Sequence, residues 1–476
     1  MKKIIYIALV ALLSSCVVKP FESKSAKELE LDALYQTVCD TTQNVAQTPW
    51  QEVFMVEELQ DIIDSVLLNN FDYQVAVLRV DQSYSMLRSA RAQIAPTLNF
   101  GADYAGTKNL SESGSAYSDN LSASLNLNWE IDLWGRLYAS KEAQKANFWA
   151  TEEAANAARQ SLIAATAQAY FEIAALEAKE RIIQEAIENR REYLQTTRDF
   201  KESGKVNEVA VQQAIAQLAE VQAALPNCQL AIVTAKNALA LLAGKTTLEE
   251  SINFDIHQEA VVLDIAGGTP VQLLSFRPDV RAAEMQYRSA HYLSMAARAA
   301  LYPSLNIGVG ASVTGITTSH SIIMNTLAGL VQPIFNGRAL RSNLEQAKAE
   351  AKISEIEFQQ SLFTAVMEVN NALHSVHNCD SIVKYQNVQL DALRKAYDYS
   401  GELFVNDYTS YLELLVAQTS VYDAELSVVD SYLNCIDARI ELYRALGGGA
   451  LQSNTIAEEI VRKKDPILKS KGKPRN

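Results

Sequence analysis

The stretch LSASLNLNWEIDLWGRL, residues 121–137, alternates apolar and polar side chains and then enters a long segment with no Gly or Pro before Gly204. Apolar residues occupy the odd positions from Leu121 to Leu133, while Ser, Asn and acidic residues occupy the even positions. An extended chain places odd and even side chains on opposite faces, so one face requires an apolar environment. A soluble β-sandwich or a transmembrane β-barrel would each provide that environment.

The predicted strand is long for a soluble protein. It covers about 10 to 13 residues, which is the length of a tilted membrane strand, whereas soluble strands average about 5 to 6. Trp129 and Trp134, near its end, are typical of the aromatic belt at a membrane interface. A long soluble hairpin with its Trp residues in a core remains the alternative at this point.

The N-terminus, MKKIIYIALVALLSSC, predicts export from the cytoplasm. Lys2 and Lys3 precede a short apolar segment and small residues, as in a secretory signal peptide, so we expect residues 1–15 to be removed. LSSC at 13–16 resembles the bacterial lipobox, which implies acylation of Cys16. Val17 follows in place of the Asp that commonly retains lipoproteins at the inner membrane, so the resemblance favours the outer membrane. Residues 16–56 would then form a lipid-anchored N-terminal arm.

Composition excludes several classes of function. The chain of 476 residues carries a net charge of −14, which argues against nucleic acid as a partner. The only basic cluster lies in the tail, residues 451–476, which we expect to be solvated. No nucleophile–base constellation or phosphate loop is recognisable, so we predict that the protein is not an enzyme and needs no cofactor.

Metal binding is also not indicated. His374 and His377 in HSVHNC are three positions apart and could share a helix face, but a lone pair at that spacing is usually incidental. Cys228, Cys379 and Cys435 show no metal-ligand spacing, and we interpret them as buried thiols. We therefore predict no metal site.

The sequence repeats itself once. IAPTLNFGADY at 94–104 recurs as LYPSLNIGVGA at 301–311, and IDLWGRLYAS at 131–140 recurs as QPIFNGRALRS at 332–342. The matched segments are offset by roughly two hundred positions, which indicates two copies of one structural unit.

Each repeat predicts a helix, two strands, a long helix, a turn and a return helix, giving a mostly α fold with a small β part. Every long helix of about 65 residues would extend on the order of 95 Å. The first repeat covers residues 57–265, with a helix over 57–93, strands at 97–105 and 121–133, and a helical hairpin at about 136–243. The second covers 266–450, with strands at 304–314 and 321–331 and a hairpin at about 338–446.

Four strands in one chain cannot close a barrel. An open sheet edge in lipid leaves backbone groups unpaired at several kcal/mol each, so we expect several copies of the chain to assemble.

The paired PTLNFG and PSLNIG elements, together with DLWGR, FNGRA, LLSFRPDVRAAE at 273–284 and YLELLVAQ at 411–418, resemble the TolC-like outer-membrane efflux proteins. The lipobox points to their NodT-type branch. The resemblance implies a homotrimer with a twelve-stranded barrel in outer-membrane lipid and an α-helical periplasmic tunnel. It also implies a periplasmic adaptor protein and an inner-membrane pump of the RND type as partners, and a passive conduit for small-molecule cargo as the function.

The resemblance further implies that the periplasmic gate and the adaptor contacts lie at the helical tips. Leu412 matches the apolar gate position, Val416 replaces an acidic residue that is common in the family, and Asp407 replaces a Gly of the turn. We therefore predict a mainly hydrophobic gate. Its residues would be Leu412 and Val416, with Tyr408, Tyr411 and Glu413 nearby. The adaptor-docking residues would be Gly204, Lys205, Val206, Asn207, Asp407 and Tyr408.

Two other functions fit parts of the sequence. A lipid-anchored coiled-coil scaffold without a pore would keep the signal and the helices, but it does not need four strands of membrane-spanning length. The tunnel of a type I protein secretion system would use the same architecture with different partners.

Overall fold

The computed structural model describes residues 48–111, 114–247, 277–314, 321–406 and 408–448, together with residues 21, 252, 255, 256, 460 and 464. The predicted signal segment, Cys16, most of the arm 16–56, Asp407 and most of the tail 451–476 lie outside the described residues.

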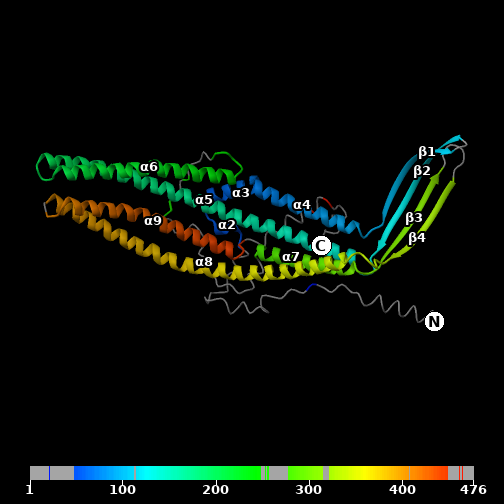
Figure 1. The fold of residues 1–476 in the computed structure, drawn as a ribbon. Helices are drawn as coiled ribbons and strands as arrows, with labels where there is room; N and C mark the ends of the chain where they lie inside the picture. The colour runs from blue at the N-terminus through cyan, green and yellow to red at the C-terminus, as the bar shows by residue number, and fades with distance from the viewer. Residues whose placement is uncertain are drawn as a thin grey trace, which may run out of the picture.

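The molecule is a long helical rod with one sheet at its end (Figure 1). The two repeats have helices of matching length, with 22, 67 and 35 residues in each. In the first repeat these helices are α4 (Phe71–Ala92), α5 (Arg136–Glu202) and α6 (Glu208–Leu242). In the second they are α7 (Pro278–Ala299), α8 (Ala339–Val405) and α9 (Tyr411–Ala445). The predicted mostly α fold with two repeats is confirmed.

The helix predicted over 57–93 is interrupted, and this part of the prediction was wrong. It consists of α3 (Glu57–Asn69) and α4, which are separated by Asn70 in an extended conformation. The Asn70 side chain accepts a hydrogen bond from the Tyr73 amide and so begins α4 as its N-cap. A short helix, α2 (Trp50–Val53), precedes α3.

The 22-residue helices α4 and α7 continue the lines of the return helices α6 and α9, respectively (Figure 1). Asn70, at the start of α4, donates through Nδ2 to the carbonyl oxygen of Leu242 at the end of α6, 3.0 Å away. Arg277, at the start of α7, donates in the same way to the carbonyl of Ala445 at the end of α9, 3.2 Å away. The last carbonyls of a helix have no partner within it, so both contacts satisfy an acceptor that the helix leaves unpaired. Two chain segments thus form one nearly continuous rod beside each long helix.

The sheet contains four antiparallel strands in the order β1-β2-β3-β4. They are β1 (Thr97–Ser111), β2 (Gly114–Ile131), β3 (Ser304–Thr314) and β4 (Ser321–Val331). β1 extends past the predicted end at 105, and β2 begins before the predicted start at 121, because the two strands pair through to Ser111 and Gly114.

The main core lies in the middle of the rod, where elements of both repeats meet. Fully buried aromatic residues from distant segments, Phe54, Tyr170, Phe171 and Tyr443, belong to this core. Trp50 and Phe54, which precede the first repeat, are therefore part of the folded core. No helix among the described residues is long and apolar enough to cross a membrane.

Candidate functional site

One face of the sheet is polar, as the alternation in β2 predicts. On this face Asn126 of β2 lies opposite Gly310 of β3, which lies opposite Asn325 of β4. A Cβ atom at Gly310 would lie 2.9 Å from Oδ1 of Asn126 and still closer to Asn325. A side chain at position 310 would therefore displace the two amide side chains, which cover the backbone of β3.

The opposite face is apolar and open. Phe100 of β1 and Ile322 and Met324 of β4 are 74%, 75% and 78% exposed. Side chains of this kind are normally buried, and an exposed apolar layer across a whole sheet marks contact with lipid or with another apolar surface.

The two repeats are joined by aromatic side chains at the base of the sheet. Trp134 donates to the carbonyl oxygen of Pro303, 2.7 Å away, and its ring stacks on Tyr302. Trp129 donates to the carbonyl oxygen of Ile94, 3.0 Å away. The indole groups thus have apolar faces and satisfied N–H donors, as is typical at a membrane interface.

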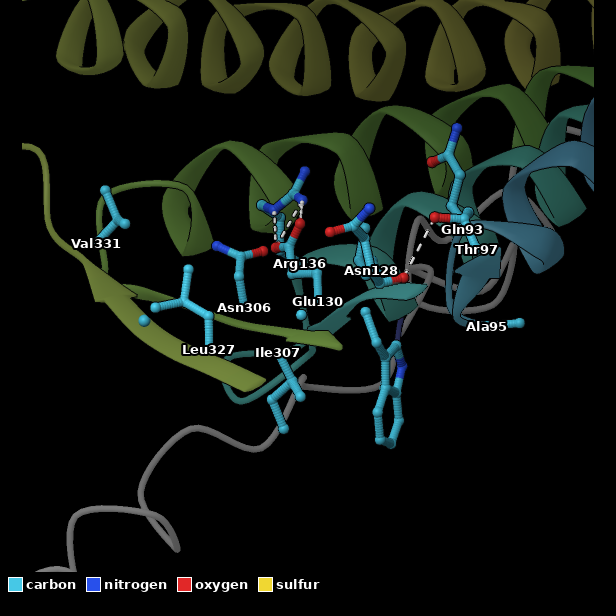
Figure 2. Close-up of a pocket in the computed structure, with 14 residues that line it drawn as sticks. Gln93, Ala95, Thr97, Asn128, Glu130, Arg136, Asn306, Ile307, Leu327 and Val331 are labelled. Atoms are coloured by element: carbon cyan, nitrogen blue, oxygen red, sulfur yellow. Dashed lines mark hydrogen bonds and ion pairs between the residues drawn. The ribbon is translucent and has the colours of Figure 1, made fainter. Parts of the chain in front are cut away.

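A cavity of about 570 Å³ opens on the polar face where the sheet meets the helices. Figure 2 shows Arg136, at the start of α5, directed at Glu130 of β2, with Asn128 and Asn306 beside the pair. Arg136 Nη2 lies 2.7 Å from each oxygen of the Glu130 carboxylate. Leu327 of β4 lines the same cavity, so its wall is amphipathic. A wall of paired charges and amides suits water and small polar solutes.

The helical tips lie at the other end of the rod (Figure 1). The first hairpin turns at Gly204, whose φ of 77° lies in the left-handed region that glycine adopts without strain. Asn207 then accepts a hydrogen bond from the Ala210 amide and begins α6. The second hairpin begins α9 with a capping box, in which Ser410 and Glu413 satisfy each other's backbone amides.

The two tips pack against each other through a small core of their own. Tyr193 stacks on Tyr411 with ring centroids 5.8 Å apart, and Phe200 meets Phe404 at 5.5 Å. Burial raises the pKa of Tyr411 to about 12, and burial also raises the pKa of Tyr193. The other buried members of this tip core are Leu194, Ala210, Val211, Ala214, Leu414 and Leu415, and Val206, Leu218 and Tyr397 pack against them.

The predicted gate residues divide into two groups. Leu412 and Val416 lie one turn apart on α9 and are 56% and 57% exposed, while Tyr408 is 81% exposed. These three side chains point away from the tip core. Tyr411 instead lies inside that core, and Glu413 is occupied by the capping box. Tyr411 is therefore buried in the protomer, whereas the Glu413 side chain is exposed beside Leu412.

Four of the six predicted docking residues lie together on the first tip. Gly204, Lys205 and Asn207 are exposed and Val206 is partly buried against the tip core. The Lys205 ammonium lies over the Phe200 ring, 5.2 Å from its centroid. Tyr408 is exposed on the second tip, and Asp407 is outside the described residues.

A polar link just behind the tips was not expected from the sequence. Arg190 of α5 is 4% exposed, and its guanidinium donates to both the backbone and the side-chain oxygen of Gln217 on α6. Thr419 of α9 donates to the same side-chain oxygen across 3.4 Å. Burial lowers the pKa of the Arg190 guanidinium. This link connects the second hairpin to the first. Together with the tip core, it holds the two tips together.

The sequence did contain a signal for Arg190. The buried positions Ile183, Ile187, Arg190, Leu194 and Thr197 on α5 follow the three- and four-residue spacing of a coiled-coil stripe. A charged residue at such a position needs a buried partner, because an unpaired buried charge is costly.

Comparison with known proteins agrees with this geometry. The model of the outer membrane efflux protein family matches residues 62–245 and 269–448. The chain is 28% identical to the cation efflux system protein CusC of Escherichia coli O6:H1 over 85% of this chain and 89% of that protein. It is 26% identical to the probable outer membrane lipoprotein SilC of Salmonella typhimurium, over 84% of this chain and 88% of that protein.

A crystal structure of CusC, described as following folding and transmembrane channel formation, superposes with a TM-score of 0.80 at 26% identity. It covers 87% of this chain and 99% of that one. The family match spans both repeats and the whole length between sheet and tips, which is not expected of a scaffold without a pore. The chain belongs to the outer membrane efflux protein family, and it is the outer-membrane channel of an efflux system and not an enzyme.

Proposed function

We propose that three copies of this chain form a closed duct that carries small-molecule cargo across the outer membrane and the periplasm. The observation that carries the proposal is the open sheet. β1 and β4 are its two edges, and its apolar face is exposed along the full width. Unpaired strand edges and exposed apolar side chains both require a partner.

A second copy of the chain fits both requirements. Because the strands alternate in direction, β4 of one copy and β1 of the next run antiparallel when placed side by side. The same pairing repeated in a closed ring leaves no edge in lipid. The family resemblance implies three copies and twelve strands, with the apolar faces toward lipid and the Asn-rich faces toward the lumen.

We propose that the tips close the duct and contact an adaptor. Leu412 and Val416 of each copy would meet around the central axis, where an apolar constriction excludes ions by dewetting. The exposed tip residues around Gly204 to Asn207 and Tyr408 would bind a periplasmic adaptor that connects the duct to an RND-type pump. Tyr411 would support this gate from within the protomer, and the exposed Glu413 would lie beside it while it holds the capping box.

We propose that acylated Cys16 anchors each copy in the outer membrane. The lipobox carries this proposal, and the named relative SilC is described as a probable lipoprotein. Mass spectrometry of the N-terminal peptide tests it: a diacylglyceryl adduct on Cys16 is expected, and an unmodified N-terminus would contradict it.

Single-channel conductance of the detergent-purified protein, measured with its oligomer mass, tests the duct. We expect a trimer that conducts in brief openings. A monomer or a dimer that leaves the bilayer silent would contradict the proposal. Cross-linking from position 205 or 408 in cells tests the docking tips. Failure to capture an adaptor from either position would contradict the proposed docking site.

A further inference from the structure

Two buried thiols face each other across the second hairpin. Cys379 of α8 and Cys435 of α9 are 6% and 4% exposed, and both are free in the structure. Their sulfur atoms lie within 4.8 Å of each other and of a carboxylate oxygen of Asp380. The positions are far apart in the sequence, and only the packing of α8 on α9 brings them together.

The surroundings do not favour a cation. The Asp380 carboxylate already pairs with Arg439, at 3.1 Å, so a guanidinium stands beside the only acidic ligand. Burial raises the pKa of both thiols, which opposes the thiolate form that a metal needs. The histidines of HSVHNC are exposed, and they are not members of this cluster.

Covalent pairing suits the same surroundings better. A disulfide is neutral, needs no ligand from Asp380 and leaves the Asp380–Arg439 pair intact. An outer-membrane channel reaches its destination through the periplasm, where disulfides form and persist. Cys228 lies elsewhere, on α6, and donates to the Leu176 carbonyl, so it does not compete for either sulfur.

We propose that Cys379 and Cys435 form a disulfide after export. The thiolate of one cysteine attacks a disulfide oxidant of the periplasm and releases one thiol of that oxidant. The second cysteine then attacks the mixed disulfide, which forms the Cys379–Cys435 bond and releases the other thiol. Two electrons pass to the oxidant, and the two protons lost from the cysteines end on its two thiols. The exchange takes place during folding, before α8 and α9 pack against each other and bury the two thiols.

The position of the bond gives it a consequence for the duct. On both helices it lies about 25 residues, on the order of 37 Å, from the tip. This step rests on the proposed function. The bond would fix α8 and α9 to each other at Cys379 and Cys435 and on the side of the bond that faces the sheet. Any rearrangement that moves Leu412 and Val416 relative to α8 is confined to the segment between the bond and the tip.

Differential alkylation of the exported, full-length protein tests the bond. Free thiols are blocked under denaturing conditions, disulfides are then reduced, and the new thiols receive a second, heavier label. We expect the heavy label on Cys379 and Cys435 and the first label on Cys228, which serves as the internal control. The first label on Cys379 and Cys435 would overturn the proposal, as would their recovery with bound Cu⁺ or Ag⁺ after titration with either ion.

Thermal stability separates the bond from simple packing. Reductant should lower the melting temperature of the native protein, by on the order of 5 °C for a loop of this size. It should not change that of a Cys379→Ser, Cys435→Ser variant, and a Cys228→Ser variant should respond to reductant as the native protein does. A native protein indifferent to reductant would overturn the proposal. None of these measurements depends on conductance, so their outcome is independent of whether the protein forms the proposed duct.

Discussion

The guanidinium of Arg277 lies 2.7 Å from the Glu368 carboxylate while only 4% of its side chain is exposed. Arg277 also pairs with Asp279 and donates to the Ala445 carbonyl, so one buried side chain joins the start of α7 to α8 and to the end of α9. Asn70 makes the corresponding contact in the first repeat, with a neutral amide. The second joint therefore carries a buried charge that depends on its partners.

Replacing Arg277 should destabilise the fold more than replacing an exposed arginine. In an Arg277→Met variant, Glu368 keeps only its longer pair with Arg444, at 3.8 Å, and the Ala445 carbonyl loses the Arg277 donor. We therefore expect a loss of about 3 kcal/mol in the free energy of unfolding. Arg191→Met is the control, because its pair with Glu188 is solvent-exposed and surface pairs contribute about 0 to 1 kcal/mol. Thermal unfolding in detergent measures both, and equal losses would show that the joint is not the stabilising feature.

Gly310 and Gly329 provide a matched pair in the sheet. A Gly310→Val variant would place its side chain against Asn126 and Asn325, so we expect poor folding and little assembled protein in the outer membrane. Gly329→Val should assemble normally, since nothing lies within 4 Å of its Cβ position and Val favours strands. Heat-resistant oligomer on gels and membrane yield measure the difference, and normal assembly of Gly310→Val would show that Asn126 and Asn325 can move aside without cost.

Local patterns predicted most of the fold. The alternation in β2, the Gly and Pro positions and the internal repeat were sufficient to predict the strands, the long helices and the hairpin turns. The repeat could not predict the break at Asn70, because the acceptor that holds Asn70 in place is the distant Leu242 carbonyl. Nor did alternation predict the end of β1, because residues 106–111 are polar or small apart from Leu110 and follow β2 by backbone pairing.

Contacts between helices explain what else was missed at the candidate site. Tyr411 is next to Leu412 in the sequence, and only the packing of four helices places Tyr411 inside and Leu412 outside. The same holds for Arg190 and Gln217, and for Cys379 and Cys435, whose partners lie on another helix. Periodicity shows which face of a helix is buried, but not which helix covers it.

Asp437 should make stability depend on pH. Burial, reinforced by the nearby Glu172 charge, raises the pKa of Asp437 to about 6, and Oδ1 has no hydrogen-bond partner among the described residues. A raised folded-state pKa means that the native state binds more protons between about pH 4 and 6, so this group's contribution to stability falls as pH rises through that range. Asp437→Asn should therefore stabilise the protein at pH 7.5, by on the order of 1 to 2 kcal/mol after solvent screening, and not at pH 4.

Melting temperatures of the native protein and Asp437→Asn across pH 4 to 8 test this expectation. Asp430→Asn on the same helix is a useful comparison, because Asp430 is half exposed and pairs with Lys179. A difference between native protein and Asp437→Asn that does not change with pH would exclude titration of Asp437 as the cause.

The link between the hairpins should restrain opening of the tips. A Gln217→Leu variant keeps the shape of the side chain but removes the oxygen that accepts from both Arg190 and Thr419. We expect more frequent channel openings, since α9 loses its polar contact with α6. Gln212→Leu is the control on the same helix, because Gln212 is exposed and donates to Glu208, one turn away on α6. Single-channel recordings of the two variants distinguish the outcomes, and equal opening frequencies would remove the link from the gate.

The apolar gate is tested by substitutions that make its side chains polar. In a Leu412→Ser, Val416→Ser variant the constriction keeps its backbone but becomes wettable, so we expect a several-fold rise in the time spent conducting. The capping box and the tip core are untouched by this change, because both side chains point away from them. Ile382→Ser is the control, since Ile382 is a comparably exposed apolar residue of α8 far from the tip. A double variant that conducts like the native trimer would show that Leu412 and Val416 do not form the barrier, whereas native-like behaviour of Ile382→Ser with an open double variant would place the barrier at the tip.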